Sequence, residues 1–236
     1  MLHRLAPFSL LFRLIIPYQI SPRAKAIIVF ELLSDPESIY QLKIIIRGIK
    51  PKIWRRVQVP GSTTLRKLHE ILQVVMGWSN YHLYAFFHGG TEYGNPDLDE
   101  ENSFTVDDSE VTLFEINDKI TPSRMIGEKT VFLYRYDFGD GWDHEIIIEN
   151  IFPKDDEKNY PVCIGGRKAC PPEDVGGICG YNDFLEAIKN PSHPEHVDKL
   201  NWIGYRFNPE SFNLNDINNR LKRFFISLKA LKEDKF

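Results

Sequence analysis

The stretch Tyr136–His144 concentrates carboxylates, aromatic rings and a histidine around a Gly-Asp-Gly turn signal. Carboxylate and imidazole groups bind divalent cations and also transfer protons, so Asp137, Asp140 and His144 are candidates for either task. The alternative interpretation is structural. An aspartate between two glycines is ordinary turn chemistry, because its side chain bonds local backbone amides.

A second pair of carboxylates, Glu173 and Asp174, follows two prolines and precedes two glycines. The prolines stiffen the chain and the glycines permit close backbone contact, so this loop can present both carboxylates at fixed positions. Alternatively, the two side chains cap backbone amides and hold the loop shut. We predict that the loop completes the hairpin's site as one cleft, whose candidate catalytic residues are Asp140, His144, Glu173 and Asp174.

Further candidates lie outside the two carboxylate motifs. The candidate binding residues are Asp137, Arg55, His82 and Trp142. The cysteines offer a second metal hypothesis, a Cys3His zinc site of Cys163, Cys170, Cys179 and His193. Their spacing, C-x6-C-x8-C, differs from the paired spacing usual for zinc, so the alternative is that Cys163 and Cys170 fasten the loop as small apolar residues.

The cysteines also bear on the compartment. They are three in number and confined to one segment, which excludes a disulfide framework and favours a reducing, cytoplasmic environment. No established cofactor is implied, although a divalent metal fits the carboxylate motifs.

The formal charge of −4 is unevenly distributed. Residues 1–90 carry 12 Lys/Arg and 4 Asp/Glu, whereas residues 91–160 carry 6 Lys/Arg and 19 Asp/Glu. We expect the basic and acidic segments mainly to pair with each other, since no lysine or arginine run of nucleic-acid type occurs. Contacts of Lys50, Lys52 and Arg55 with phosphate are the alternative, which would make a nucleic acid the partner.

Periodicity places these residues on secondary structure. Alternating apolar residues predict strands at Tyr40–Arg47, Ile53–Val59, His82–His88, Thr130–Phe138 and Trp142–Glu149. Residues 153–178 show no period and many prolines and glycines, which predicts a long loop.

An apolar stripe predicts a helix that is capped by Thr63 or Thr64 and ends at Gly77. Three later helices are predicted at Tyr181–Lys189, His193–Trp202 and Leu214–Leu231. This order of elements favours an α+β fold, in which an antiparallel or mixed sheet has helices packed on one side and further helices at the C-terminus.

Residues 1–38 differ from the rest of the chain. Met1–Ile16 is apolar but interrupted by Pro7, Arg4 and Arg13, so it is too short and broken to span a membrane. We expect a loosely attached extension, which one interpretation places upstream of the natural start. A peripheral membrane anchor is the alternative.

Several motifs, in this order, resemble the plasmid pRiA4b ORF-3-like family over residues 39–227, which leaves 228–236 as a C-terminal tail. These motifs are Ile49–Arg56, Thr64–His69, Gly77-Trp78, His82-Leu83-Tyr84, Tyr136–His144, Cys170–Gly177 and Gly180-Tyr181. The resemblance implies an α+β fold and brings no established activity or catalytic residues. Many members carry a second histidine where this chain has Tyr84, so a paired-histidine metal site is not expected here.

Two functions follow as hypotheses. The first is a binding or accessory module linked to mobile elements, an association that the family resemblance alone supplies. The second is a metal-assisted hydrolase that uses the carboxylate–histidine cleft. The sequence favours the first, because it shows no nucleophile beside a base at the spacing that covalent catalysis requires.

Overall fold

The computed structural model describes residues 35–96, 105–118 and 130–233. The expected extension at 1–38 lies almost wholly outside them. Within the described ranges one eight-stranded sheet has the order β5-β4-β3-β6-β7-β1-β2-β8, and only the β4–β5 pair is parallel. Its strands are β1 (Ile39–Ile46), β2 (Trp54–Pro60), β3 (Tyr84–His88), β4 (Thr91–Gly94), β5 (Val106–Asp107), β6 (Val131–Tyr136), β7 (Trp142–Phe152) and β8 (Val162–Arg167).

Five helices accompany the sheet in the described residues, which confirms the predicted α+β class. They are α3 (Leu65–Met76), α4 (Leu113–Asp118), α5 (Gly177–Lys189), α6 (His196–Ile203) and α7 (Leu214–Glu233). Helix α7 continues beyond residue 227, where the expected domain ends. None of these described helices has the length and apolar character needed to cross a membrane.

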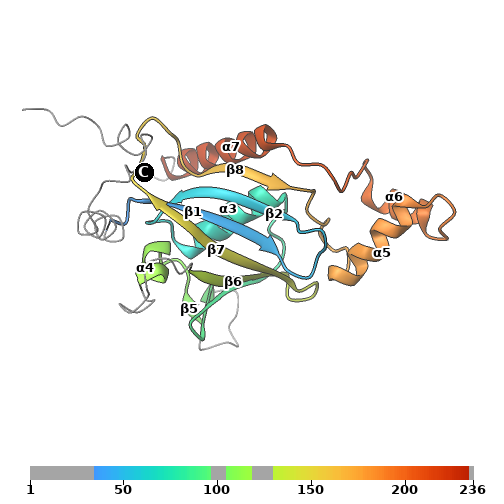
Figure 1. The fold of residues 1–236 in the computed structure, drawn as a ribbon, viewed down its shortest axis with the longest axis horizontal. Helices are drawn as coiled ribbons and strands as arrows, with labels where there is room; N and C mark the ends of the chain where they lie inside the picture. Colours follow the sequence, from blue (N-terminus) through green and yellow to red (C-terminus); the bar gives the residue numbers. More distant parts are fainter. Residues whose placement is uncertain (1–34, 97–104, 119–129, 234–236) are drawn as a thin grey trace, which may run out of the picture.

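Helix α3 lies behind the sheet in Figure 1, and its apolar stripe joins the main core. Thr64 caps the helix by accepting a hydrogen bond from the Lys67 amide at 3.2 Å. Gly77 ends it in the left-handed conformation at φ 89°, which favours glycine. Both ends were therefore predictable from local residue types.

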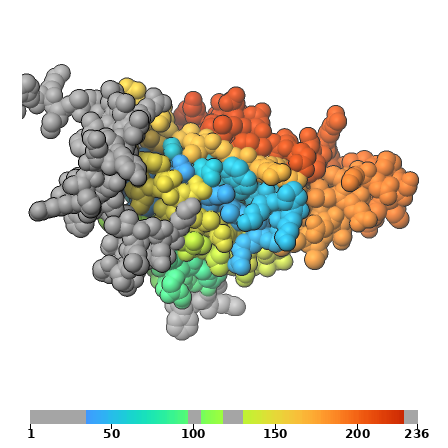
Figure 2. Space-filling view, viewed as in Figure 1, coloured from blue at the N-terminus to red at the C-terminus, as the bar shows by residue number. Residues whose placement is uncertain are grey.

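Helices α5 and α6 project from one end of the sheet, where Figure 1 and Figure 2 show them as a lobe of their own. The ring of Phe184 on α5 is fully buried and packs edge-on against Trp202 and Phe207. Helix α7 returns along the sheet beside β8. The loop before α5 and the segment before α7 are thus each held between two packed elements, β8 and α5 for the loop and α6 and α7 for the segment.

The structure corrects the prediction of a long loop over residues 153–178, since β8 lies inside it and pairs with β2. The strand escapes period analysis because two of its six residues are glycines. A Cβ atom on Gly166 would lie 2.2 Å from the Phe212 ring, so the missing side chain makes room for an aromatic of another segment. Tertiary packing explains this strand better than its own sequence does.

His144 is a core residue, which contradicts the predicted position in an open cleft. Its side chain is fully buried, stands edge-on to Trp78 and contacts the Tyr134 carbonyl oxygen at 3.3 Å through Nδ1. Burial lowers the pKa of His144 to about 4, because a charged imidazolium is poorly solvated there. Burial likewise lowers the pKa of His69, whose ring bonds Tyr134 and Asn80, to about 4.

Both histidines have a lower pKa in the folded state than in the unfolded chain. The stability that the protein has with these rings neutral is therefore fully present above pH 6.5 and is lost as the pH falls toward 4. We expect each to lower the free energy of unfolding by about 2 kcal/mol between pH 7 and pH 5. Urea unfolding of His144→Leu should show a smaller loss over this interval than the natural chain. Ile146→Val, on the same buried face of β7, should lower stability equally at both pH values; an unchanged slope in His144→Leu would contradict the assignment.

Candidate metal-binding site

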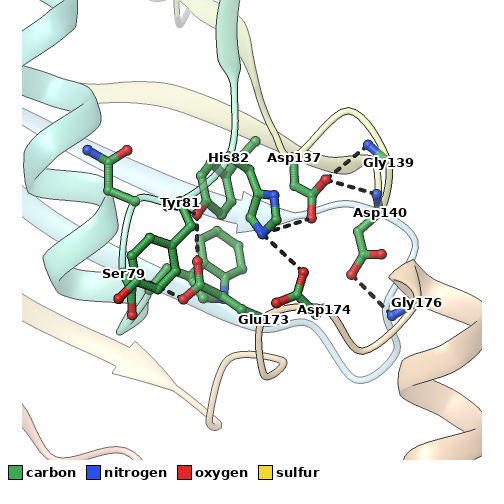
Figure 3. Close-up of polar contacts among 12 residues, drawn as sticks. Ser79, Tyr81, His82, Asp137, Gly139, Asp140, Glu173, Asp174 and Gly176 are labelled. Carbon is green, nitrogen blue, oxygen red and sulfur yellow. Dashed lines mark hydrogen bonds and ion pairs between the residues drawn. The ribbon is translucent and has the colours of Figure 1, made fainter.

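Asp137 occupies the entry to the hairpin between β6 and β7. Its φ of 57° turns the chain, and its carboxylate Oδ1 accepts hydrogen bonds from the Gly139 and Asp140 amides at 2.9 and 3.2 Å. The residue is buried with 7% of its surface exposed. These bonds fix the carboxylate and leave Oδ2 directed away from the turn (Figure 3).

The loop between β8 and α5 is anchored to the end of α3. The Trp78 indole donates to the Pro171 carbonyl oxygen at 3.0 Å. Glu173 accepts from the Tyr136 hydroxyl at 2.6 Å and from the Ser79 amide at 2.8 Å, so both of its oxygens are engaged. Burial, and then the Glu173 carboxylate, raise the pKa of Tyr136, which therefore keeps the proton that it donates.

The same loop meets the hairpin at a second point. The Gly176 amide donates to Asp140 Oδ2 at 3.1 Å, as Figure 3 shows. Gly177 follows at φ 65°, and a Cβ atom there would lie 2.5 Å from the Asp140 carbonyl oxygen. Glycine at 177 therefore permits a backbone approach that other residues would block. These contacts bring the loop against the hairpin at Asp140, but they do not assemble the predicted cleft, because His144 lies in the core.

His82 joins the two halves. Its Nε2 lies 3.1 Å from Asp174 Oδ1 and 3.7 Å from Asp137 Oδ2, and Figure 3 shows the ring between the two carboxylates. The ring stands edge-on to Tyr136, with centroids 5.8 Å apart. Although Nε2 is buried, it forms no contact with hydrogen-bond geometry among the described residues.

The three side chains offer one nitrogen and two carboxylate oxygens that all lie within 4.8 Å of one another. This donor set suits Zn²⁺ or Mn²⁺, since both accept imidazole and carboxylate ligands. Three protein ligands also leave coordination positions for water or a substrate. The Asp174 side chain is 68% exposed, so the site is open on that side.

Comparison with known proteins places the chain in a family. The family model described as plasmid pRiA4b ORF-3-like protein matches residues 38–216. The chain belongs to the plasmid pRiA4b ORF-3-like family. This confirms the predicted membership.

Two relatives extend the comparison. An uncharacterized protein, y4hQ, from Sinorhizobium fredii (strain NBRC 101917 / NGR234) is 40% identical over 167 residues, which cover 71% of this chain and 81% of y4hQ. The crystal structure of MM3350, a protein of unknown function from Methanosarcina mazei Go1, matches with a TM-score of 0.66 and 36% identity. That match covers 77% of this chain and 98% of MM3350. Neither name states an activity.

In this pRiA4b ORF-3-like chain the predicted cleft residues separate into different environments. Asp174 borders the candidate site, whereas Asp140 and Glu173 hold backbone amides at the joint. His82, predicted only as a binding residue, occupies the place expected for His144. The reason is strand pairing: Tyr84 lies opposite Tyr136, and the Asp137 amide donates to the Leu83 carbonyl oxygen at 2.9 Å. The His-Leu-Tyr motif could have indicated the position of His82, but only if the pairing register of β3 with β6 had been known.

Two further binding candidates are buried. Arg55 is 3% exposed and donates to the Val75, Trp54 and Arg167 carbonyl oxygens, so it lies too deep for the predicted contact with nucleic-acid phosphate. Trp142 is 1% exposed and packs against Trp78 in the core.

The cysteine site is not assembled in the structure. The thiol of Cys163 contacts the Gly165 carbonyl oxygen, Cys170 lies against Arg55, and Cys179 is exposed on α5. Burial raises the pKa of Cys163 and Cys170, which disfavours the thiolate that zinc requires. These cysteines and His193 lie in described segments, and within those segments none of them comes together with two other side chains that could bind a metal. The interpretation as apolar fasteners fits Cys163 and Cys170.

Glu173→Ala should lower the free energy of unfolding by about 2 kcal/mol, because it leaves the buried Tyr136 hydroxyl and the Ser79 amide without their acceptor. Chemical denaturation measures this change. Glu195→Ala is a matched control, since that carboxylate contacts Lys199 at 3.7 Å on an exposed helix and should change stability by less than about 0.5 kcal/mol. Equal effects of the two substitutions would contradict the role of Glu173 as the anchor.

Proposed function

We propose that this chain is a binding module whose working site is a divalent cation held by His82, Asp137 and Asp174. The observation that carries the proposal is the convergence of three ligand atoms within 4.8 Å from three separate segments of the chain. Asp137 is buried and Asp174 is exposed, so a cation there would meet one fixed carboxylate, one imidazole nitrogen and one carboxylate open to solvent.

The local structure supports a prepared site. The Asp137 carboxylate is oriented by hydrogen bonds from two backbone amides, and Asp174 Oδ1 already lies 3.1 Å from His82 Nε2. Where many members of the family are expected to carry a second histidine, this chain has Tyr84, so the proposed site combines the single imidazole of His82 with two carboxylates.

The wider role extends this proposal. A role as an accessory factor of mobile elements draws its support from the plasmid in the family's name. The cytoplasmic location stays a prediction from the cysteine content. A cation site can serve such a module by ordering the loop that contains Asp174, by holding a partner's oxygen ligand, or by both.

Saturating Zn²⁺ or Mn²⁺ should stabilise the natural chain against heat, by about 2.7 kcal/mol when the metal is at one hundred times its dissociation constant. Asp137→Asn and Asp174→Asn should each remove most of this stabilisation, because each loses one charged ligand. Differential scanning calorimetry with and without chelator gives the shift.

Asp140→Asn serves as the control, since Asp140 holds the Gly176 amide and lies outside the ligand set. It should retain the metal-dependent shift. A natural chain that no divalent metal stabilises, or an Asp140 variant that loses the shift as fully as Asp137→Asn, would argue against the site.

The second candidate function is a metal-assisted hydrolase. One observation favours it: Asp174 also lines a cleft of about 610 Å³, which is large enough for a small substrate. A cation on Asp174 would lower the pKa of a bound water and place the resulting hydroxide beside a group in the cleft.

The hydrolase predicts turnover that depends on the metal. The natural chain loaded with Zn²⁺ or Mn²⁺ should release p-nitrophenol from p-nitrophenyl phosphate or acetate, and Asp137→Asn should slow this at least about a hundredfold. Metal binding by calorimetry without turnover of either ester would leave the binding module as the function and exclude hydrolysis of these two ester classes.

A further inference from the structure

The cleft beside Asp174 has a second wall that the cation site does not use. It lies between the loop 169–174, the end of α3, and the segment from Trp202 to the first turns of α7. Its volume of about 610 Å³ falls within the range of small-molecule pockets. Three arginines line it, namely Arg55, Arg206 and Arg220.

Arg55 places a buried positive charge at the cleft. All of its hydrogen bonds go to uncharged acceptors, which are three backbone carbonyl oxygens and the Cys170 sulfur at 3.0 Å. It forms no ion pair with a carboxylate among the described residues. The guanidinium also lies over the Phe212 ring, 5.1 Å from its centroid, so this charge is compensated by dipoles and a ring and adds a positive potential to the cleft.

The other two arginines lie closer to solvent. Arg206 is exposed and forms no ion pair within the described ranges. Arg220 contacts Asp216 at 3.2 Å, yet its Nε is buried and forms no hydrogen bond there. The Nε of Arg220 faces Asp216, so a ligand in the cleft would meet the terminal nitrogens of Arg220 and the exposed guanidinium of Arg206.

The acidic residues of the cleft are occupied elsewhere. Both oxygens of Glu173 accept hydrogen bonds, from the Tyr136 hydroxyl and the Ser79 amide, and Asp174 faces His82. Asp216 lies beside Arg220. An anion would thus be attracted toward Arg206 and Arg220. It would be repelled from the side of the cleft formed by the loop, where Glu173 and Asp174 are negatively charged.

Aromatic rings border the same space. Trp202 is 47% exposed and Tyr205 is 59% exposed, and both line the cleft. The Trp202 indole is steadied by an edge-on contact with Phe184 at 5.7 Å between ring centroids. An exposed but supported indole is a surface on which a planar ring can stack.

We infer that the cleft binds a phosphate ester with a planar ring, of the nucleoside monophosphate class. The phosphate is held by Arg206 and Arg220 and the ring lies against Trp202. Bidentate guanidinium contacts suit phosphate, and the aromatic wall distinguishes such a ligand from inorganic phosphate. This site does not require the cation at His82, Asp137 and Asp174.

Isothermal titration of the full chain in EDTA tests the inference with three probes: adenosine monophosphate, adenosine and inorganic phosphate. The nucleotide should bind, and Arg206→Gln and Arg220→Gln should each raise its Kd at least about tenfold. Arg223→Gln is the matched control on α7, because its exposed guanidinium donates, among the described residues, to the Asn219 carbonyl oxygen and does not line the cleft, and it should leave the Kd unchanged. Trp202→Ala should weaken the nucleotide more than phosphate.

Absence of nucleotide binding to the natural chain would overturn the inference, as would an equal loss in the Arg223 control. Equal affinity for nucleotide and inorganic phosphate would overturn the assignment of the ring. Binding that needs Mn²⁺, disappears in Asp137→Asn and ignores both arginine variants would also refute this site while supporting the cation site. Arg206 is exposed, so its variant remains informative even where Arg220→Gln does not fold.

Discussion

The short hydrogen bond from the Tyr136 hydroxyl to Glu173, 2.6 Å long, is the contact on which the candidate site depends. Tyr136 belongs to the sheet and is fully buried, whereas Glu173 belongs to a loop without regular structure. Through this bond the rigid sheet fixes the position of the loop, and the neighbouring Asp174 is fixed with it. The Ser79 amide ties the same carboxylate to the end of α3, so three elements meet at one side chain.

Local sequence signals account for much of the fold and for only part of the site. The cap at Thr64, the left-handed end at Gly77 and the alternation along β1, β2, β6 and β7 are properties of neighbouring residues, so they could be predicted. Edge strand β8 could not, because Gly165 and Gly166 face rings contributed by distant segments. His144 shows the opposite case, because the local pattern of β7 is itself enough to place it. It is close in sequence to Asp140, yet its alternation along β7 directs it into the core.

The grouping of His82 with Asp137 and Asp174 depends on contacts between segments that are 55 and 37 residues apart in the chain. Each of the three residues was identified as a candidate from its own motif. Their convergence required the β3–β6 register and the anchoring of the loop by Glu173, neither of which leaves a local pattern. Sequence reasoning therefore identified the three side chains but paired the hairpin with the wrong histidine.

The uneven charge of the chain bears on the three arginines that line the cleft, Arg55, Arg206 and Arg220. Basic residues of the first third pair with acidic residues of the middle, as expected: Arg56 contacts Glu149 at 2.6 Å and Arg66 contacts Asp108 at 2.8 Å. Arg55 is the neighbour of Arg56 on the same strand, but the alternation of β2 turns it to the opposite face. That face offers it carbonyl oxygens and a thiol instead of a carboxylate. Neighbouring arginines of one strand thus differ: Arg56 forms an ion pair on one face, whereas Arg55 is buried on the other with no ion pair among the described residues.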